Sequence, residues 1–167
     1  DIHGGGRDLI FPHHENEIAQ SESASGKPFV KYWVHNGFVN IDQEKMSKSL
    51  GNFLTVKDIL KSHHPEAVRL FLLSNHYRSP VDFNQKAMEE ASAALEKIYT
   101  FLERAERKLG AFAKRDELPG ELWEEFRKAM NDDFNTARGL GALLSNIRRL
   151  NRLLDEPDSG ASGEPVE

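Results

Sequence analysis

The second half of this chain carries an apolar repeat that only long amphipathic helices can satisfy. Between Asn84 and Gly110, apolar side chains recur at alternating intervals of three and four residues, at Met88, Ala91, Leu95, Ile98, Leu102, Ala105 and Leu109. This interval places them along one side of a helix, and Gly110 is a typical stop signal. Two shorter stripes follow, at Leu122, Phe126 and Met130, and at Leu140, Leu143, Ile147, Leu150 and Leu154. With Thr136 as the predicted N-cap of the last helix, residues 82–155 are expected to form an antiparallel bundle.

The stripes predict which side chains form the core of this bundle. The residues expected to face one another are Leu95, Ile98, Leu102, Leu143, Ile147 and Leu150. Residues 156–167 are rich in Gly, Ser, Pro and acidic residues, a composition typical of a flexible tail.

The first part of the chain combines shorter signals that alternate between strand and helix. Gly4–Gly6 follow the end of a predicted strand, where glycine lets the backbone approach a ligand closely. β-formers from Trp33 to Ile41 predict another strand. Thr55 and Asp58 have the spacing of a capping box, which begins a short helix. These signals predict an α/β unit over residues 1–81.

Composition narrows the classes of function without selecting one. The chain has no cysteine, so neither a disulfide nor a thiolate metal site can form within it. No apolar run reaches membrane-spanning length and no signal peptide is present, so the cytoplasm is the expected location. The net charge of −5 arises entirely after residue 81, and an acidic helical region is not an obvious RNA-binding footprint. Arg148, Arg149 and Arg152 could contact phosphate there, although such residues more often form a solvated helix face.

A short polar stretch carries the clearest phosphate-binding signal. The string Lys45-Met46-Ser47-Lys48-Ser49 places two lysines around a serine. Lysine is a mobile point charge that can follow a polyphosphate as its charge shifts, and the hydroxyl and backbone N–H groups here can donate to phosphate oxygens. A solvated loop is the alternative interpretation, because most Lys/Ser stretches are solvated loops.

A second stretch offers two metal ligands. Pro12 fits the first turn of a helix, where its missing N–H costs nothing. A helix that begins there brings His13 and Glu17 onto one face, and an imidazole and a carboxylate at that spacing can share a metal ion. His14 is expected to point elsewhere, toward the side of Ile18. The alternative is an ordinary polar helix start, with acidic residues near the positive end of the helix dipole.

Together these strings resemble the cysteinyl-tRNA synthetases, a family of class I aminoacyl-tRNA synthetases. The resemblance begins with DIHGGGRDLIFPHHENEIAQ at residues 1–20 and continues through Trp33-Val34-His35-Asn36-Gly37 into KMSKSLGN at residues 45–52. It extends to residues 69–74, 76–79 and 131–136.

The fold that this resemblance implies has two parts. Residues 1–81 correspond to the second part of a Rossmann-like catalytic domain, with the zinc-ligand helix and the KMSKS loop, and residues 82–155 correspond to a helical domain. Because the chain starts abruptly at the Gly-rich turn, it is expected to be a fragment that begins inside a larger nucleotide-binding domain.

The resemblance also implies an activity. The parent enzyme would join cysteine to ATP, forming cysteinyl-adenylate and pyrophosphate, and would then transfer cysteine to tRNA(Cys). Lys48, supported by Lys45, would stabilise charge on the transferring phosphates. The resemblance assigns ATP binding to Asp8, Met46, Ser47, Lys48 and Ser49, places His3 beside the bound amino acid, and makes His13 and Glu17 two of the zinc ligands.

Zinc has a physical purpose in such a site. A substrate thiolate bonds zinc strongly, whereas a serine hydroxyl does so poorly, so a site built on that bond can reject serine without editing. The resemblance places the remaining thiolate ligands outside this chain. The fragment alone is accordingly expected to be inactive, and self-association is one way in which it would cover exposed core surface.

Two other functions fit the same residues. A cysteine ligase that acts on an amino-sugar shares the FPHHE and KMSKS motifs, although the longer HHENEIAQS string and the DDFNT string at residues 132–136 favour the synthetase. A non-catalytic binding module of the same fold is the other alternative. The intact lysines of the KMSKS string argue against degeneration of the parent.

Overall fold

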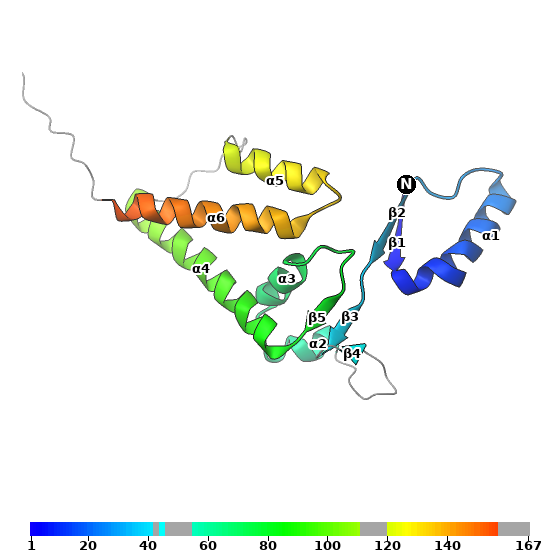
Figure 1. Ribbon diagram of the computed structural model, residues 1–167, viewed down its shortest axis with the longest axis horizontal. Coiled ribbons are helices and arrows are strands. Elements are labelled where there is room, and N and C mark those ends of the chain that lie inside the picture. The colour runs from blue at the N-terminus through cyan, green and yellow to red at the C-terminus, as the bar shows by residue number, and fades with distance from the viewer. Residues whose placement is uncertain (42–43, 46–54, 111–119, 157–167) are drawn as a thin grey trace, which may run out of the picture.

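The structure is a computed structural model of the 167-residue chain, and it describes residues 1–41, 44–45, 55–110 and 120–156. Figure 1 shows an α/β region that continues into a helical region. In chain order the elements are β1 (Ile2–Gly6), the helical turns η1 (Arg7–Leu9) and η2 (Ile10–His14), α1 (Glu15–Ser25), β2 (Tyr32–Asn36), β3 (Val39–Ile41), β4 (Glu44–Lys45), α2 (Val56–Ile59), α3 (Pro65–Leu73), β5 (Val81–Phe83), α4 (Gln85–Leu109), α5 (Glu121–Asn131) and α6 (Thr136–Asp155).

The first sheet is a parallel pair. β1 and β2 run in register from Ile2 opposite Tyr32 to Gly6 opposite Asn36, and α1 lies in the connection between them. Parallel strands need a crossover of this kind, because a tight turn can join only antiparallel neighbours. The pair therefore brings β2 beside the residues that lead from β1 into α1.

The second sheet has the order β4-β3-β5, with β3 antiparallel to β4 and parallel to β5. The predicted strand from Trp33 to Ile41 is thus two strands in different sheets, interrupted at Gly37 and Phe38. Helices α3 and α4 pack against this sheet, and Met88 of α4 is fully buried. The buried apolar cluster consists of Ala67, Val68, Phe71, Val81, Met88 and Ala91.

Helices α4 and α6 each begin at a side chain that accepts a hydrogen bond from the first turn. Asn84 Oδ1 accepts from the Ala87 N–H at 2.8 Å and satisfies one of the free donors at the start of α4. The predicted N-cap of α6, Thr136, is instead its first residue. The cap is Asn135, whose Oδ1 accepts from the Arg138 N–H at 3.0 Å. Both residue types are favourable caps, so the local sequence does not separate them.

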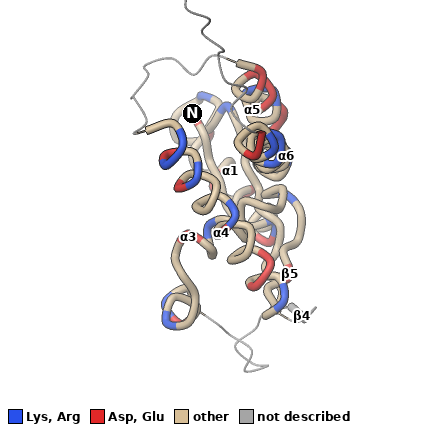
Figure 2. Tube along the Cα trace, turned by 90° about the vertical axis from the view of Figure 1, so that its left-hand side faces the viewer, with Lys and Arg blue, Asp and Glu red and all other residues tan. Residues whose placement is uncertain are grey.

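The helical unit predicted from the apolar stripes is confirmed, and α6 packs against both of its neighbours. Helices α5 and α6 form an antiparallel hairpin (Figure 1), in which Gly139 lies close to the Phe126 ring. Helices α4 and α6 converge at their C-terminal ends, where Arg104 donates to Asn151 at 2.7 Å. Residues of both charges lie along this unit in Figure 2.

The predicted helix interface is only partly closed. Ile147 is 5% exposed, whereas Leu102 remains 40% exposed. An apolar hollow of about 490 Å³ stays open between the C-terminal ends of α4 and α6, where Phe101 and Leu150 are among the residues that line it. None of the helices in the described ranges combines the length and apolarity that crossing a membrane requires. The predicted tail, after Glu156, lies outside the described residues.

Candidate functional site

Three potential metal ligands from separate elements meet beside β1. His3 lies on β1, His14 at the end of η2 and Glu17 in the first turn of α1, and one ligand atom from each lies within 4.8 Å of the others. The Nε2 atom of His3 is 2.8 Å from Oε2 of Glu17. The Nε2 atom of His13 is 3.6 Å from Oε1 of the same carboxylate. Each oxygen of Glu17 therefore has an imidazole beside it.

The Glu17 carboxylate is not fully satisfied by these neighbours. Its Oε2 atom is buried and forms no hydrogen bond of acceptable geometry with the described residues, although His3 lies close. Buried carboxylate oxygens are normally hydrogen-bonded, paired with a cation or bound to a metal. Imidazole nitrogens and a carboxylate oxygen are ligands that zinc accepts, so the groups around Glu17 fit a zinc ion.

His14 occupies a different place from the one predicted. It is 3% exposed, and its Nδ1 atom lies 2.9 Å from Nε2 of His35 on β2. Burial lowers the pKa of His14, and the nearby imidazoles of His3 and His35 lower it further. The ring is therefore neutral at neutral pH, with one nitrogen that donates and one that accepts.

His14 is the last residue of the turn that precedes α1. The helix begins at Glu15, not at Pro12, and residues Ile10–His14 form a separate turn in which Phe11 is extended, with φ −136° and ψ 134°. The expectation that His14 points away from the other candidate ligands is wrong, because its ring lies close to His3 and Glu17 as well as to His35. In the observed turn His14 faces β2, while His13 and Glu17 still lie near each other.

Two aromatic residues of β2 complete the surroundings of the cluster. Trp33 and His35 share one side of the strand because alternate residues point to the same face, and their rings stack at 5.9 Å with an interplanar angle of 6°. The His3 ring meets Trp33 edge-on at 5.0 Å. The spacing of Trp33 and His35 in a predicted strand was the available sequence signal, but it could not identify His14 as their partner.

Gly5 makes room for the buried imidazole. A Cβ atom at this position would lie 3.1 Å from the His14 ring and 2.8 Å from Leu9 Cδ1. Such contacts are closer than packed side chains tolerate. One function of the Gly-rich turn is therefore to let His14 approach β1.

The structure describes only some of the predicted nucleotide-binding residues. Asp8 is exposed in η1, and its carboxylate lies against Gly6, where a Cβ atom would overlap it. Lys45 lies in β4, with its backbone paired opposite Asn40. Met46, Ser47, Lys48 and Ser49 lie outside the described residues, so their assignment to ATP stays a prediction.

Comparison with protein families assigns a separate match to each part of the chain. Residues 1–93 match the family described as "tRNA synthetases class I (C) catalytic domain", and residues 125–164 match the family described as "DALR domain".

Curated relatives match along almost the whole chain. A cysteine–tRNA ligase of Syntrophotalea carbinolica is 56% identical over 169 residues, covering 99% of this chain and 35% of the relative. A cysteine–tRNA ligase of Geobacter metallireducens is 55% identical, covering 99% of this chain and 36% of the relative. The chain thus spans about a third of the length of these relatives.

Solved structures share the fold at low sequence identity. The Mycobacterium tuberculosis methionyl-tRNA synthetase in complex with methionyl-adenylate has a TM-score of 0.68 at 18% identity, covering 93% of this chain and 34% of that one. A LeuRS–tRNA–LeuAMS ternary complex from Agrobacterium radiobacter K84 has a TM-score of 0.65 at 20% identity, covering 91% of this chain and 23% of that one. Both likenesses extend over the α/β region and the helices.

Proposed function

Because the chain belongs to the class I (C) tRNA synthetases, we propose that it is part of a cysteine–tRNA ligase, which activates cysteine with ATP and transfers it to tRNA(Cys). The observation that carries this proposal is the identity of 55–56% over 99% of the chain with ligases of that name. The match includes the helices as well as the α/β region, which favours the tRNA ligase over a cysteine:amino-sugar ligase. The cytoplasm is the compartment that this activity implies.

For the metal, the proposed zinc ligands in this chain are His13 and Glu17. The side chain of His13 is 58% exposed, so ligands from outside this chain can reach the same ion. His14 is less suitable, because its ring is buried between Gly5 and His35 and its Nδ1 atom is already engaged. Since zinc sites usually have three or four protein ligands, the remaining ones would be thiolates from the rest of the protein. When bound, zinc would hold the cysteine substrate through its sulfur, which distinguishes it from serine.

His3 would act at the amino-acid end of the site. Its Nε2 atom lies 2.8 Å from the buried oxygen of Glu17, and its ring contacts the rings of Trp33 and Phe29. A side chain restrained by packing keeps its orientation with little further loss of entropy. His3 would therefore orient the Glu17 carboxylate and contact the bound amino acid.

The nucleotide would be bound by the KMSKS string. Lys48, with Lys45, would place positive charge at the transferring phosphates. Met46, Ser47 and Ser49 would contact ATP through backbone N–H and hydroxyl groups, and Asp8 would accept from the ribose hydroxyls. Because Lys45 lies in β4, which pairs with β3, the sheet would hold the start of this string in place.

The decisive experiment uses the full-length protein that contains this chain. Cysteine-dependent ATP–pyrophosphate exchange and charging of tRNA(Cys) are both expected, and Lys48→Ala should slow exchange about 10²–10³-fold. Lys57→Ala, at an exposed position of α2, is the matched control and should leave exchange unchanged. Exchange without tRNA charging, but with transfer to an amino-sugar, would establish the rival ligase. The absence of exchange in the wild-type protein would leave a non-catalytic module.

The 167-residue chain alone should not activate cysteine, because it offers only two of the proposed zinc ligands. Exchange assays with added zinc test this. Robust turnover that is lost on Lys48→Ala would show that the site is complete within the chain.

A further inference from the structure

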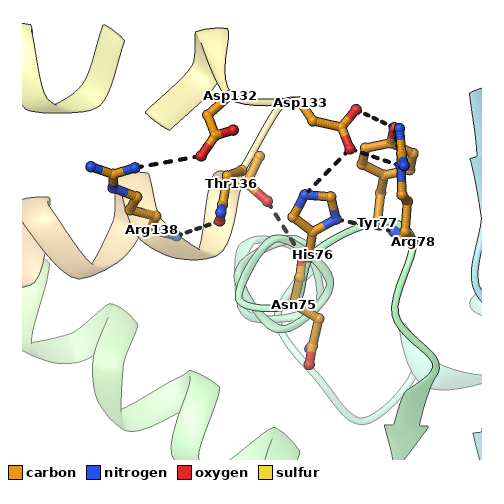
Figure 3. Close-up of polar contacts among 9 residues, drawn as sticks. Asn75, His76, Tyr77, Arg78, Asp132, Asp133, Thr136 and Arg138 are labelled. Atoms are coloured by element: carbon orange, nitrogen blue, oxygen red, sulfur yellow. Dashed lines mark hydrogen bonds and ion pairs between the residues drawn. The ribbon is translucent and has the colours of Figure 1, made fainter. Parts of the chain in front are cut away.

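The turn between α5 and α6 contacts the segment that follows α3 through one carboxylate. Asp133 Oδ1 accepts a hydrogen bond from the Tyr77 phenol at 2.6 Å, and Oδ2 lies 2.7 Å from Nε of Arg78 (Figure 3). Arg78 Nε also donates to the Tyr77 oxygen at 3.0 Å, and His76 Nε2 lies 3.8 Å from Asp133 Oδ2. Three consecutive residues therefore converge on one side chain of the helical unit.

The turn that carries Asp133 has an unusual backbone conformation. Asp133 and Phe134 both have left-handed conformations, with φ of 56° and 52°. This region is unfavourable for residues other than glycine, and two in succession persist only where surrounding contacts hold them. The turn is closed by the Asn135 N–H, which donates to the Ala129 carbonyl at 3.1 Å.

The other side of the same segment contacts the junction between the two sheets. The Tyr77 carbonyl accepts a hydrogen bond from the Gly37 N–H at 2.7 Å. A Cβ atom at Gly37 would overlap the Ser79 carbonyl, so the two backbones are in direct contact. The Val81 N–H donates to the Phe38 carbonyl at 2.8 Å and continues this contact into β5.

Residues 76–79 thus lie between the helical unit and the residues that join β2 to β3. Strand β2 carries His35, which contacts His14 of the candidate metal site. Strand β3 pairs with β4, which contains Lys45. Residues 76–79 therefore connect the helical unit to the junction of these two strands through backbone hydrogen bonds.

We propose that Asp133 is a positioning residue that fixes the helical unit to the β2–β3 junction, and that the reaction step requiring tRNA depends on it. This inference rests on the proposed ligase function. Cysteine and ATP are small enough to be bound by the catalytic unit alone, whereas tRNA is long enough to contact both units. Loss of Asp133 should therefore affect charging more than adenylate formation.

The experiment compares four variants of the full-length protein. Asp133→Ala removes both contacts, and Asp133→Asn retains an acceptor for Tyr77 but removes the charge beside Arg78. Tyr77→Phe removes the hydroxyl that donates to Asp133 and accepts from Arg78. Asp132→Ala is the matched control, because Asp132 is the adjacent carboxylate but pairs with Arg138 inside the helical unit at 3.5 Å. The measurements are pyrophosphate exchange, the kcat and KM of tRNA charging, and hydrogen–deuterium exchange of residues 32–41.

Asp133→Ala is expected to raise the KM for tRNA about tenfold, the effect of losing charge-assisted hydrogen bonds, while cysteine-dependent exchange stays within about twofold of wild type. Deuterium uptake at the Gly37 amide should accelerate. Asp133→Asn and Tyr77→Phe should show intermediate effects, and Asp132→Ala should show none of them.

Unchanged charging in Asp133→Ala, or equal losses of exchange and charging, would overturn the proposal. If Asp133→Ala does not fold, Asp133→Asn and Tyr77→Phe are judged by the same criteria. A wild-type protein without cysteine-dependent exchange would refute the ligase function instead, and deuterium uptake at Gly37 would still show whether Asp133 holds the junction.

Discussion

His14 Nδ1 lies 2.9 Å from His35 Nε2, so one imidazole donates a hydrogen bond to the other across the space between η2 and β2. Because His14 is buried, this contact satisfies a polar atom that water cannot reach. It also ties the start of α1, which carries Glu17, to the strand that carries Trp33.

His35→Phe should therefore destabilise the protein although it preserves an aromatic ring beside Trp33. The substitution leaves His14 Nδ1 buried without its partner, and we expect the melting temperature to fall by roughly 2–10 °C. Thermal unfolding followed by circular dichroism measures this. Tyr32→Phe, at a 65% exposed position of the same strand, is the control. An equal effect of both substitutions would show that the imidazole pair contributes nothing specific.

Met88→Ala should strongly destabilise the core between α3, α4 and β5. Met88 is 0% exposed, and truncating a fully buried methionine leaves a cavity that costs about 2–5 kcal/mol of unfolding free energy. Leu109→Ala on the same helix is the matched control, because Leu109 is 71% exposed. Urea denaturation compares the two variants. If Leu109→Ala lowered the unfolding free energy as much as Met88→Ala, the observed packing of α4 would be contradicted.

Gly37→Ala tests the contact between the β2–β3 junction and residues 76–79. The added methyl group would overlap the Ser79 carbonyl, so the two backbones must separate and the stability must fall. Gly141→Ala provides a control of opposite sign. No atom lies within 4 Å of a Cβ there, and replacing glycine inside a helix raises stability by about 0.5–1 kcal/mol. A Gly37→Ala variant with undiminished stability, and with unchanged hydrogen–deuterium exchange of the backbone amide at position 37, would disprove the close approach of the two backbones.

Asp58 gives a pH dependence of defined sign. Its pKa is lowered from 3.8 to about 2, first by the hydrogen bond from Lys61 and then by that from Thr55. Because the folded-state pKa lies below the unfolded value, ionised Asp58 stabilises the folded state fully above pH 3.8, and this contribution is lost as pH falls through about 2.

The comparison with Asp58→Asn isolates this effect. The difference in unfolding free energy between wild type and variant should be constant between about pH 5 and 7 and should shrink below about pH 4. Urea denaturation over this range measures it. A difference that grows on acidification would have the wrong sign for a depressed carboxyl pKa.

Local sequence patterns determined the helical half of this protein. The apolar repeat from Met88 to Leu109 predicts α4 because side chains three and four residues apart share a helix face. Asn84 and Gly110 mark its ends for equally local reasons, which are a side chain that accepts from the first turn and a residue that ends the helix without strain. The family resemblance of residues 1–20 and of the KMSKS string was likewise evident from the sequence, without knowledge of any tertiary contact.

Tertiary structure alone decided the contacts that assemble the site. Thr136 and Asn135 are both suitable caps, and the left-handed turn at Asp133 and Phe134 selects Asn135. The position of His14 beside β2 depends on the parallel pairing of β1 with β2, which brings His35 within 2.9 Å of the His14 imidazole. Asp133 and Tyr77 are 56 residues apart in sequence, and no periodicity relates two positions at that separation. Sequence patterns report what each residue does with its near neighbours, whereas these three features depend on which distant backbone each segment packs against.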